Sequence, residues 1–298
     1  MKKFSLHEPQ LKGNEKFNVK QCLDTGWLSS SGNFVSKFEN KLEKFTNTNV
    51  ICCNSGTSAL HISLILAGVK PGEEVIVPSI TFIATVNTVL YCSANPVFMD
   101  CDDSLCMDVD KLLDFLKYKT YSIKKNTFNK KTKKKISAIM ITSVFGNLAN
   151  MRILAKECKS KNIKLIEDAA EALGSYYSGE NIHSGTIGDY GTLSFNVNKI
   201  ITTGAGGAIL YRNNSEKIKI KRLIAQGKID NLLFKHKFLG YNYGMCNTNA
   251  AIGCAQLENI EFILKKKEKI NLFYSDFFSK TKNITIIKSK NNQKANNW

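Results

Sequence analysis

Residues 50–78 read VICCNSGTSALHISLILAGVKPGEEVIVP, and this stretch predicts the fold class. An apolar run at 50–53 is followed by a polar turn, a helical pattern at 58–68 and a second apolar run at 74–78. Both apolar runs are continuous rather than alternating, which is typical of strands that are covered on both faces. Two such strands joined through a helix form a βαβ unit with parallel strands.

The same alternation of strand and helix continues along the chain. Further strand-like runs lie at 95–100, 135–145, 163–168 and 207–211, and further helical patterns lie at 84–92, 109–117 and 151–160. We therefore predict an α/β fold in which helices sandwich a mostly parallel central sheet. A long helix is expected at 248–268, leading out of this core.

The composition is that of a soluble, cytoplasmic protein. Hydrophobic residues make up 43% and charged residues 22% of the chain, so a folded core is expected rather than disorder. We find no secretory signal and no apolar stretch of the ~18 residues that a membrane span needs. The nine cysteines are odd in number and form no CxxC pattern, which predicts reduced thiols and no metal site.

The formal net charge of +17 raises the possibility of a nucleic-acid partner. Residues 117–135 contribute nine lysines and no acid, and residues 261–298 add a net +6, which leaves only +2 for the rest. Neither segment contains an arginine, the side chain best suited to reading bases. A solvated lysine loop at 117–135 is therefore favoured over nucleic-acid binding.

Three polar groups follow predicted strands, at the edge of the sheet where ligands gather in open α/β folds. Residues 54–58, NSGTS, begin a helix whose free N–H groups suit a phosphate, although for this segment alone a plain helix cap is the favoured explanation. Asp168 ends a buried strand, where it needs a cation or a protonated ring as a partner, or else caps the next helix.

The third group is Lys199, which follows Ser194 and precedes the glycine-rich turn at 202–207. A surface turn with an incidental lysine is the alternative for this segment alone. Taken together, the three groups are the parts that pyridoxal phosphate requires. The lysine bonds the aldehyde, the aspartate keeps the ring nitrogen protonated, and the helix terminus binds the phosphate.

The order of these motifs resembles that of the DegT/DnrJ/EryC1/StrS family of sugar aminotransferases. The resemblance runs through essentially the whole chain and includes NSGTSALHISLILAGVKPGEEVIVPSITFIATVNTV, EDAAEALGS, GDYGTLSFNVNKIITTGAGG and GYNYGMCNTNAAIGCAQLE. It implies the fold of type I pyridoxal-phosphate transferases, with a large cofactor-binding domain at 1–245. Because relatives continue further, residues 246–298 are expected to begin a smaller domain that is incomplete here.

The resemblance also implies roles for individual residues. Lys199 and Asp168 would be catalytic, the first bonded to the cofactor and the second paired with its ring nitrogen. The other expected cofactor contacts are Gly56, Thr57, Ser58 and Ser194 at the phosphate, Phe82 and Glu171 at the ring, and Asn242 at the phosphate of a neighbouring subunit. The expected lining of the sugar pocket is Trp27, Ser29 and Ser30.

The implied reaction moves an amino group from glutamate to a nucleotide-linked keto-deoxysugar, with C4 as the expected position, for surface polysaccharide or glycan synthesis. The implied assembly is a homodimer with shared active sites. Related dehydratases carry histidine at the position of Lys199, so the lysine favours transamination. A regulatory or catalytically impaired paralogue and a basic nucleic-acid-binding protein remain as alternatives. A dinucleotide-binding dehydrogenase is disfavoured, because GAGG at 204–207 precedes a strand instead of opening a helix.

Overall fold

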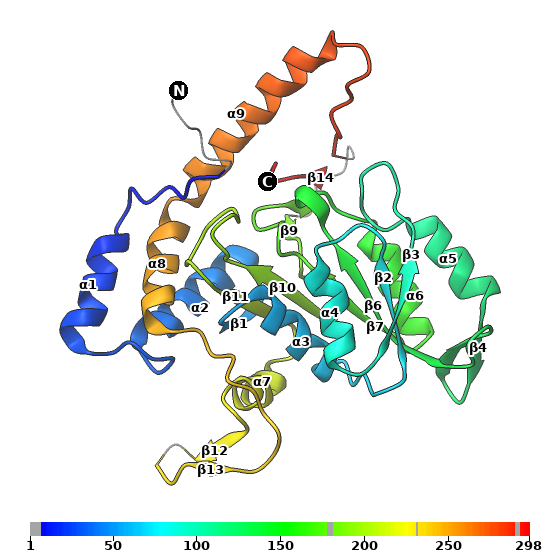
Figure 1. Ribbon diagram of the computed structural model, residues 1–298, viewed down its shortest axis with the longest axis horizontal. Coiled ribbons are helices and arrows are strands. Elements are labelled where there is room, and N and C mark those ends of the chain that lie inside the picture. The colour runs from blue at the N-terminus through cyan, green and yellow to red at the C-terminus, as the bar shows by residue number, and fades with distance from the viewer. Residues whose placement is uncertain (1–6, 178–180, 231, 290–292) are drawn as a thin grey trace.

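The computed structural model describes residues 7–177, 181–230, 232–289 and 293–298. Helices cover both faces of one large sheet (Figure 1). The helices are α1 (Glu15–Thr25), α2 (Asn33–Thr46), α3 (Gly56–Leu66), α4 (Ile83–Tyr91), α5 (Val109–Tyr118), α6 (Met151–Ser160), α7 (Lys217–Ile224), α8 (Asn247–Glu258) and α9 (Ile260–Ser279), with short 3₁₀ turns at Val144–Gly146 and Asn214–Glu216.

The strands of the large sheet are β1 (Asn49–Cys53), β2 (Glu74–Pro78), β3 (Asn95–Met99), β4 (Thr120–Ile123), β5 (Asn126–Asn129), β6 (Lys135–Thr142), β7 (Lys164–Asp168), β10 (Tyr190–Ser194) and β11 (Gly207–Tyr211). Two small sheets contain β8 (Tyr176–Tyr177), β9 (Ile182–His183) and β14 (Gln293–Lys294), and β12 (Lys228–Asp230) and β13 (Lys235–His236). These bounds confirm the strands that the apolar runs predict.

The sheet is mostly parallel, as predicted. Its strands lie in the order β1-β11-β10-β7-β6-β2-β3, and every pair from β10 to β3 is parallel. Strand β11 is antiparallel to both of its neighbours, β1 and β10. The carboxyl ends of β6, β7, β2 and β10 therefore meet at one edge, where ligands bind in open α/β sheets.

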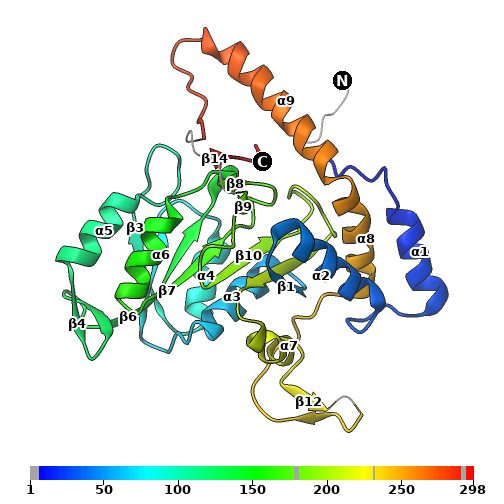
Figure 2. The same cartoon turned by 180° about the vertical axis from the view of Figure 1, so that it is seen from behind.

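Apolar side chains on the two sheet faces form separate parts of the core. Helices α3, α4 and α7 cover one face (Figure 1), and α2, α5 and α6 cover the other (Figure 2). Within β7, Leu165 packs into the second of these layers and Ile166 into the first, because successive side chains of a strand point to opposite faces. The same alternation directs the side chains of the next two residues, Glu167 and Asp168, to opposite faces of the sheet.

The structure corrects three local predictions. Strand β10, between β7 and β11 in the sheet, was not predicted, because its sequence YGTLS lacks a continuous apolar run. The lysine-rich segment is not a plain loop, since β4 and β5 pair as a hairpin that continues onto β6. The single helix expected at 248–268 is broken at Asn259, whose backbone (φ −103°, ψ 7°) departs from helical geometry.

Helix α8 packs against α1 and α2, whereas α9 extends away from the body of the molecule (Figures 1 and 2). Most side chains of α9 are at least partly exposed, and its buried residues, Ile260 and Ile263, lie in its first turn. The domain boundary between residues 245 and 246 remains a prediction. Across the described part of the chain, no helix combines the length and hydrophobicity required to cross a bilayer.

Candidate active site

Asp168 is the last residue of β7, and its side chain points to the face that carries α4. The residue is only 3% exposed, and its carboxylate accepts hydrogen bonds from Thr85 Oγ1 (2.6 Å) and from the backbone N–H of Ala170 (3.2 Å). Burial raises the pKa of Asp168, while the Thr85 hydrogen bond lowers it. A cation at this carboxylate would offset the unfavourable burial of its charge.

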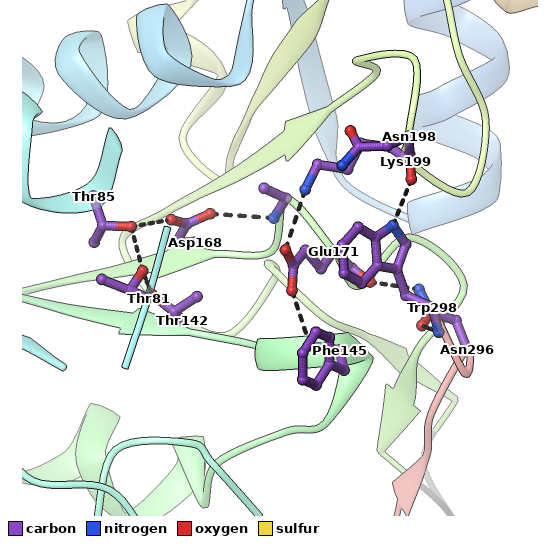
Figure 3. A network of polar contacts seen from close by, with 11 residues as sticks. Thr81, Thr85, Thr142, Phe145, Asp168, Glu171, Asn198, Lys199, Asn296 and Trp298 are labelled. Atoms are coloured by element: carbon purple, nitrogen blue, oxygen red, sulfur yellow. Dashed lines mark hydrogen bonds and ion pairs between the residues drawn. The ribbon is translucent and has the colours of Figure 1, made fainter. Parts of the chain in front are cut away.

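A chain of threonine hydroxyls supports Asp168 (Figure 3). Thr85 also bonds Thr81 (2.7 Å), which in turn bonds Thr142 (2.9 Å) at the end of β6. Thr85 and Asp168 are 83 residues apart in sequence, so neither the pair nor the chain was predicted. The threonines restrict the Asp168 carboxylate to one orientation.

Lys199 lies in the loop after β10, and its amine faces Glu171. The Nζ atom is 3.2 Å from Glu171 Oε1, and the two side chains are only 12% and 15% exposed. The other oxygen of Glu171 accepts the backbone N–H of Phe145 at 2.9 Å. A half-enclosed amine paired with one carboxylate, close to a second buried carboxylate, is the arrangement expected for a reactive lysine.

Phe145 and Trp298 line the same site, although sequence reasoning missed both. Phe145 has a φ of 53°, a left-handed conformation that is rare for a bulky residue and that directs its N–H toward Glu171. Its ring stacks on Trp298, with centroids 5.6 Å apart. No local pattern identifies either residue, because their contacts arise between distant segments.

The amino terminus of α3 also borders the site. Ser55 caps the helix by accepting the N–H of Ser58, whereas the first-turn N–H groups of Gly56 and Thr57 have no acceptor within the helix. A Cβ atom at Gly56 would lie 2.8 Å from the Cβ of Ser194, so only glycine allows this close approach. The helix terminus and the Ser194 hydroxyl together suit an anion.

These groups open into one cavity of about 530 Å³. Seven of the predicted site residues line it: Gly56, Thr57, Phe82, Asp168, Glu171, Ser194 and Lys199. The lining residues that the sequence did not single out include Thr81, Phe145, Asn198 and Trp298. The structure thus brings these seven residues together around one cavity, and their individual roles toward a cofactor remain predictions.

The other predicted residues lie outside this cavity in the single chain. The hydroxyl of Ser58 bonds Asn54 Oδ1 (2.6 Å) and Ser55 Oγ (2.8 Å), so it supports the cap instead of facing the cavity. The backbone carbonyl of Asn242 accepts a hydrogen bond from the side-chain amide of Asn54, beside the cap. Trp27 is 57% exposed in the connection between α1 and α2.

Ser29 and Ser30 lie in that same connection, close to α8. The Ser29 carbonyl accepts the N–H of Asn247 at the start of α8, and Ser30 lies near Gly244. The roles of these two serines and of Ser58, Asn242 and Trp27 in binding remain predictions.

The chain also matches a family model. The model of the DegT/DnrJ/EryC1/StrS aminotransferase family aligns with residues 9–298. The chain belongs to this family. The resemblance carried by the motifs is therefore confirmed, and so is the class of enzyme, an aminotransferase.

Several relatives of this aminotransferase have named activities. It is 38% identical over 274 residues to the GDP-perosamine synthase of Caulobacter vibrioides, covering 91% of this chain and 69% of that protein. It is 33% identical over 271 residues to the UDP-4-amino-4,6-dideoxy-N-acetyl-beta-L-altrosamine transaminase of Campylobacter jejuni, covering 90% and 68%. The chain therefore spans about two thirds of the length of these relatives.

A solved structure shows the same fold. The aminotransferase PseC of Helicobacter pylori, involved in the biosynthesis of pseudoaminic acid, superposes with a TM-score of 0.87 at 26% identity. The superposition covers 99% of this chain and 76% of that one. The predicted fold of type I pyridoxal-phosphate transferases is confirmed.

Pyridoxal phosphate is the cofactor of the family, and the cavity of this aminotransferase fits it. A helix terminus for the phosphate, a buried carboxylate and a lysine amine line one enclosed space. The amide oxygen of Asn198 is buried in the wall of this space and has no hydrogen-bond partner among the described residues. An unpaired buried acceptor of this kind suits a site that is completed by a polar group.

Proposed function

We propose that this aminotransferase moves an amino group from glutamate to a nucleotide-linked keto-deoxysugar for surface polysaccharide or glycan synthesis. The observation that carries the proposal is the meeting of Lys199, Asp168 and the α3 terminus in one cavity. The sugar class is supported by the relatives, whose names specify a GDP-linked and a UDP-linked amino sugar. The amino group at position 4 in the Campylobacter name supports C4 as the position aminated.

The side chains of the cavity divide the chemistry between them. Pyridoxal phosphate, when bound, would supply an aldehyde that accepts the amino group and a ring that takes up the electron pair left on the donor carbon when its proton is removed. Lys199 Nζ would hold the cofactor through its aldehyde carbon and, when free, would move a proton from the donor carbon to that former aldehyde carbon. Asp168 keeps a positive charge on the ring nitrogen.

The remaining groups bind and orient. The first-turn N–H groups of α3 and the Ser194 hydroxyl hold the phosphate, and the exposed Phe82 ring covers one face of the cofactor. Glu171 binds the Lys199 amine whenever that amine is not bonded to the cofactor, since the two side chains form an ion pair. Trp27, Ser29 and Ser30 complete the sugar pocket, with Asn242 reaching a neighbouring subunit.

We propose a cytoplasmic homodimer. None of the nine cysteines, all of which lie in the described part of the chain, forms a disulfide, as suits a reducing compartment. The β12–β13 hairpin, which ends close to Asn242, carries exposed apolar side chains: Leu232, Leu233, Phe234, Phe238 and Leu239. Exposed apolar clusters of this kind mark surfaces that associate. Light scattering of the purified protein tests the dimer, and a monomer at all concentrations would contradict it.

The test of the chemistry is an absorption spectrum of the cofactor-saturated protein with and without glutamate. We expect glutamate to convert the band of the lysine-bonded cofactor into that of its aminated form. Borohydride reduction before glutamate should fix the cofactor mass on Lys199, as mass spectrometry of peptides will show. Lys199→Arg is the control and should show neither the band nor turnover. Reduction that leaves residue 199 unlabelled in the unaltered protein would contradict the proposal.

The sugar is tested separately in the second half of the reaction. Protein aminated by glutamate is freed of excess donor and mixed with GDP- or UDP-linked 4-keto-6-deoxysugars. Return of the original band, together with an amino sugar in the product, identifies the acceptor. If no such sugar restores the band although glutamate removes it, the acceptor class is wrong and the cofactor assignment stands.

A further inference from the structure

The indole ring of Trp298 lies over the amine of Lys199. The Nζ atom is 4.6 Å from the ring centroid, which is within the range of a cation–π contact. The same amine is 3.2 Å from Glu171 Oε1 (Figure 3). Lys199 is therefore held between a carboxylate and an aromatic face, and its side chain remains only 12% exposed.

Three contacts fix the orientation of the Trp298 ring. It stacks on Phe145 at an interplanar angle of 13°. Its Nε1 donates to the carbonyl of Asn198, the residue before Lys199, at 2.9 Å. Its backbone N–H donates to Asn296 Oδ1 at 3.1 Å. The indole is therefore bonded to the loop that carries Lys199, and the backbone of Trp298 is bonded to its neighbour Asn296.

Residues 293–298, which we name the strap, are built into the site. The amide of Asn296, which is 3% exposed, donates to the carbonyls of Glu171 (2.7 Å) and Leu173 (2.9 Å). Gln293 exchanges side-chain hydrogen bonds with both backbone groups of Leu148, and β14 pairs with β8. The strap therefore binds the loop that contains Glu171, so both partners of the lysine amine are held by one substructure.

We propose that Trp298 is a positioning residue for Lys199. Its ring holds the free amine beside Glu171, which is where the amine must wait whenever it is not bonded to the cofactor. This inference rests on the proposed function, because it gives Trp298 a part in that reaction. The Trp298 ring affects the reaction only through the position of the Lys199 amine, and the amine itself forms the bond to the cofactor.

The first test uses the cofactor-free protein and measures how fast an N-hydroxysuccinimide ester acylates Lys199, followed by quantitative mass spectrometry. Loss of a desolvated cation–π contact should raise the fraction of molecules in which the Lys199 amine has left the ring by about 3- to 30-fold. Trp298→Leu should therefore label Lys199 faster by that factor. Trp298→Phe keeps an aromatic face and should stay within about threefold of the unaltered protein.

Two controls accompany this test. Phe17→Leu removes an aromatic ring that is 62% exposed on α1, and it should leave the labelling of Lys199 unchanged. The exposed Lys124 in the same sample corrects for the activity of the reagent. Equal labelling rates in the Leu, Phe and unaltered proteins would overturn the proposal, and so would a Phe variant as fast as the Leu variant.

The second test is spectroscopic and separates positioning from mere packing. In a Trp27→Phe background, Trp298 is the only tryptophan, so its emission reports on its own surroundings. Lys199→Gln should change that emission, because a charge 4.6 Å from the centroid acts on the excited indole. Unchanged emission would overturn the proposal. Failure of borohydride to label Lys199 in the unaltered protein would instead refute the proposed function.

Discussion

Glu167 and Asp168 are neighbouring carboxylates at the end of the same buried strand, yet their surroundings differ. Glu167 is 2% exposed and accepts three backbone N–H groups, those of Gly185 (3.0 Å), Ile187 (2.6 Å) and Gly188 (2.6 Å). Asp168 is 3% exposed, accepts two hydrogen bonds and lines the cavity. The strand alternation alone sends one to each face.

The two carboxylates thus differ in whether their hydrogen bonds are made wholly within the fold or leave one side facing the cavity. Burial raises the pKa of both groups, and hydrogen bonds lower it again in both. The N–H groups that bond Glu167 belong to the loop at residues 185–188. The hydrogen-bond acceptor capacity of this carboxylate is therefore used within the fold. The carboxylate of Asp168 can still accept a hydrogen bond on the side that faces the cavity, where a cationic ring nitrogen can lie.

The largest effect is expected from Asp168→Asn, which removes the charge and keeps the shape. We expect the rate of the glutamate half-reaction to fall about 10³-fold, as for the loss of one preorganised electrostatic contact. Stopped-flow absorbance measures this rate. The cofactor-free variant should be no less stable than the unaltered protein, since ionising a carboxyl whose pKa is raised destabilises the fold.

The sign of that stability difference follows from the raised pKa. The folded protein holds the proton of Asp168 to a higher pH than the unfolded chain does. Stability contributed by this group is therefore full below the unfolded pKa and decreases as pH rises toward the folded one. Urea unfolding of the Asn variant should show a weaker decrease over that range. If Asp168→Asn carried out the half-reaction at the rate of the unaltered protein, the proposed difference in function between Asp168 and Glu167 would be contradicted.

Glu167→Gln should produce the opposite pattern. An amide can accept fewer of the three N–H groups than a carboxylate, so about 2–3 kcal/mol of unfolding free energy should be lost. The half-reaction rate of the folded molecules should stay within about twofold, because this residue lies on the face away from the cofactor. Urea unfolding and stopped-flow absorbance measure the two quantities. A variant of full stability but low rate would show that Glu167 is not structural.

The smallest effect is expected from Thr85→Val, which removes only the hydroxyl bonded to Asp168. The rate should fall about tenfold, the value of one hydrogen bond to a charged group. The Thr85 hydrogen bond lowers the pKa of Asp168, so its loss raises that pKa. The acid limb of the pH–rate profile should therefore move to higher pH. Thr85→Ser restores the hydroxyl and should restore the profile; an unshifted limb in the Val variant would contradict this role.

The elements that the sequence predicted well are those with a strong local pattern. The continuous apolar runs identified β1, β2, β3, β6, β7 and β11, and the residues following them identified Asp168 and the α3 terminus. Strand β10 was missed because glycine and threonine interrupt its apolar pattern. The lysine-rich hairpin was missed because a high charge masks the alternation of Thr127 and Asn129, which are buried.

The sequence by itself determined the alternation of strands and helices and the family, and it singled out Lys199 and Asp168, which the structure brings to one cavity. Hydrophobic periodicity and cap residues act over a few positions, so they are visible in the chain without its fold. The tertiary structure alone decided which groups surround that pair. Thr85 is 83 residues from Asp168, and Trp298 is 100 residues from Asn198, so only the packing of distant segments could bring them together.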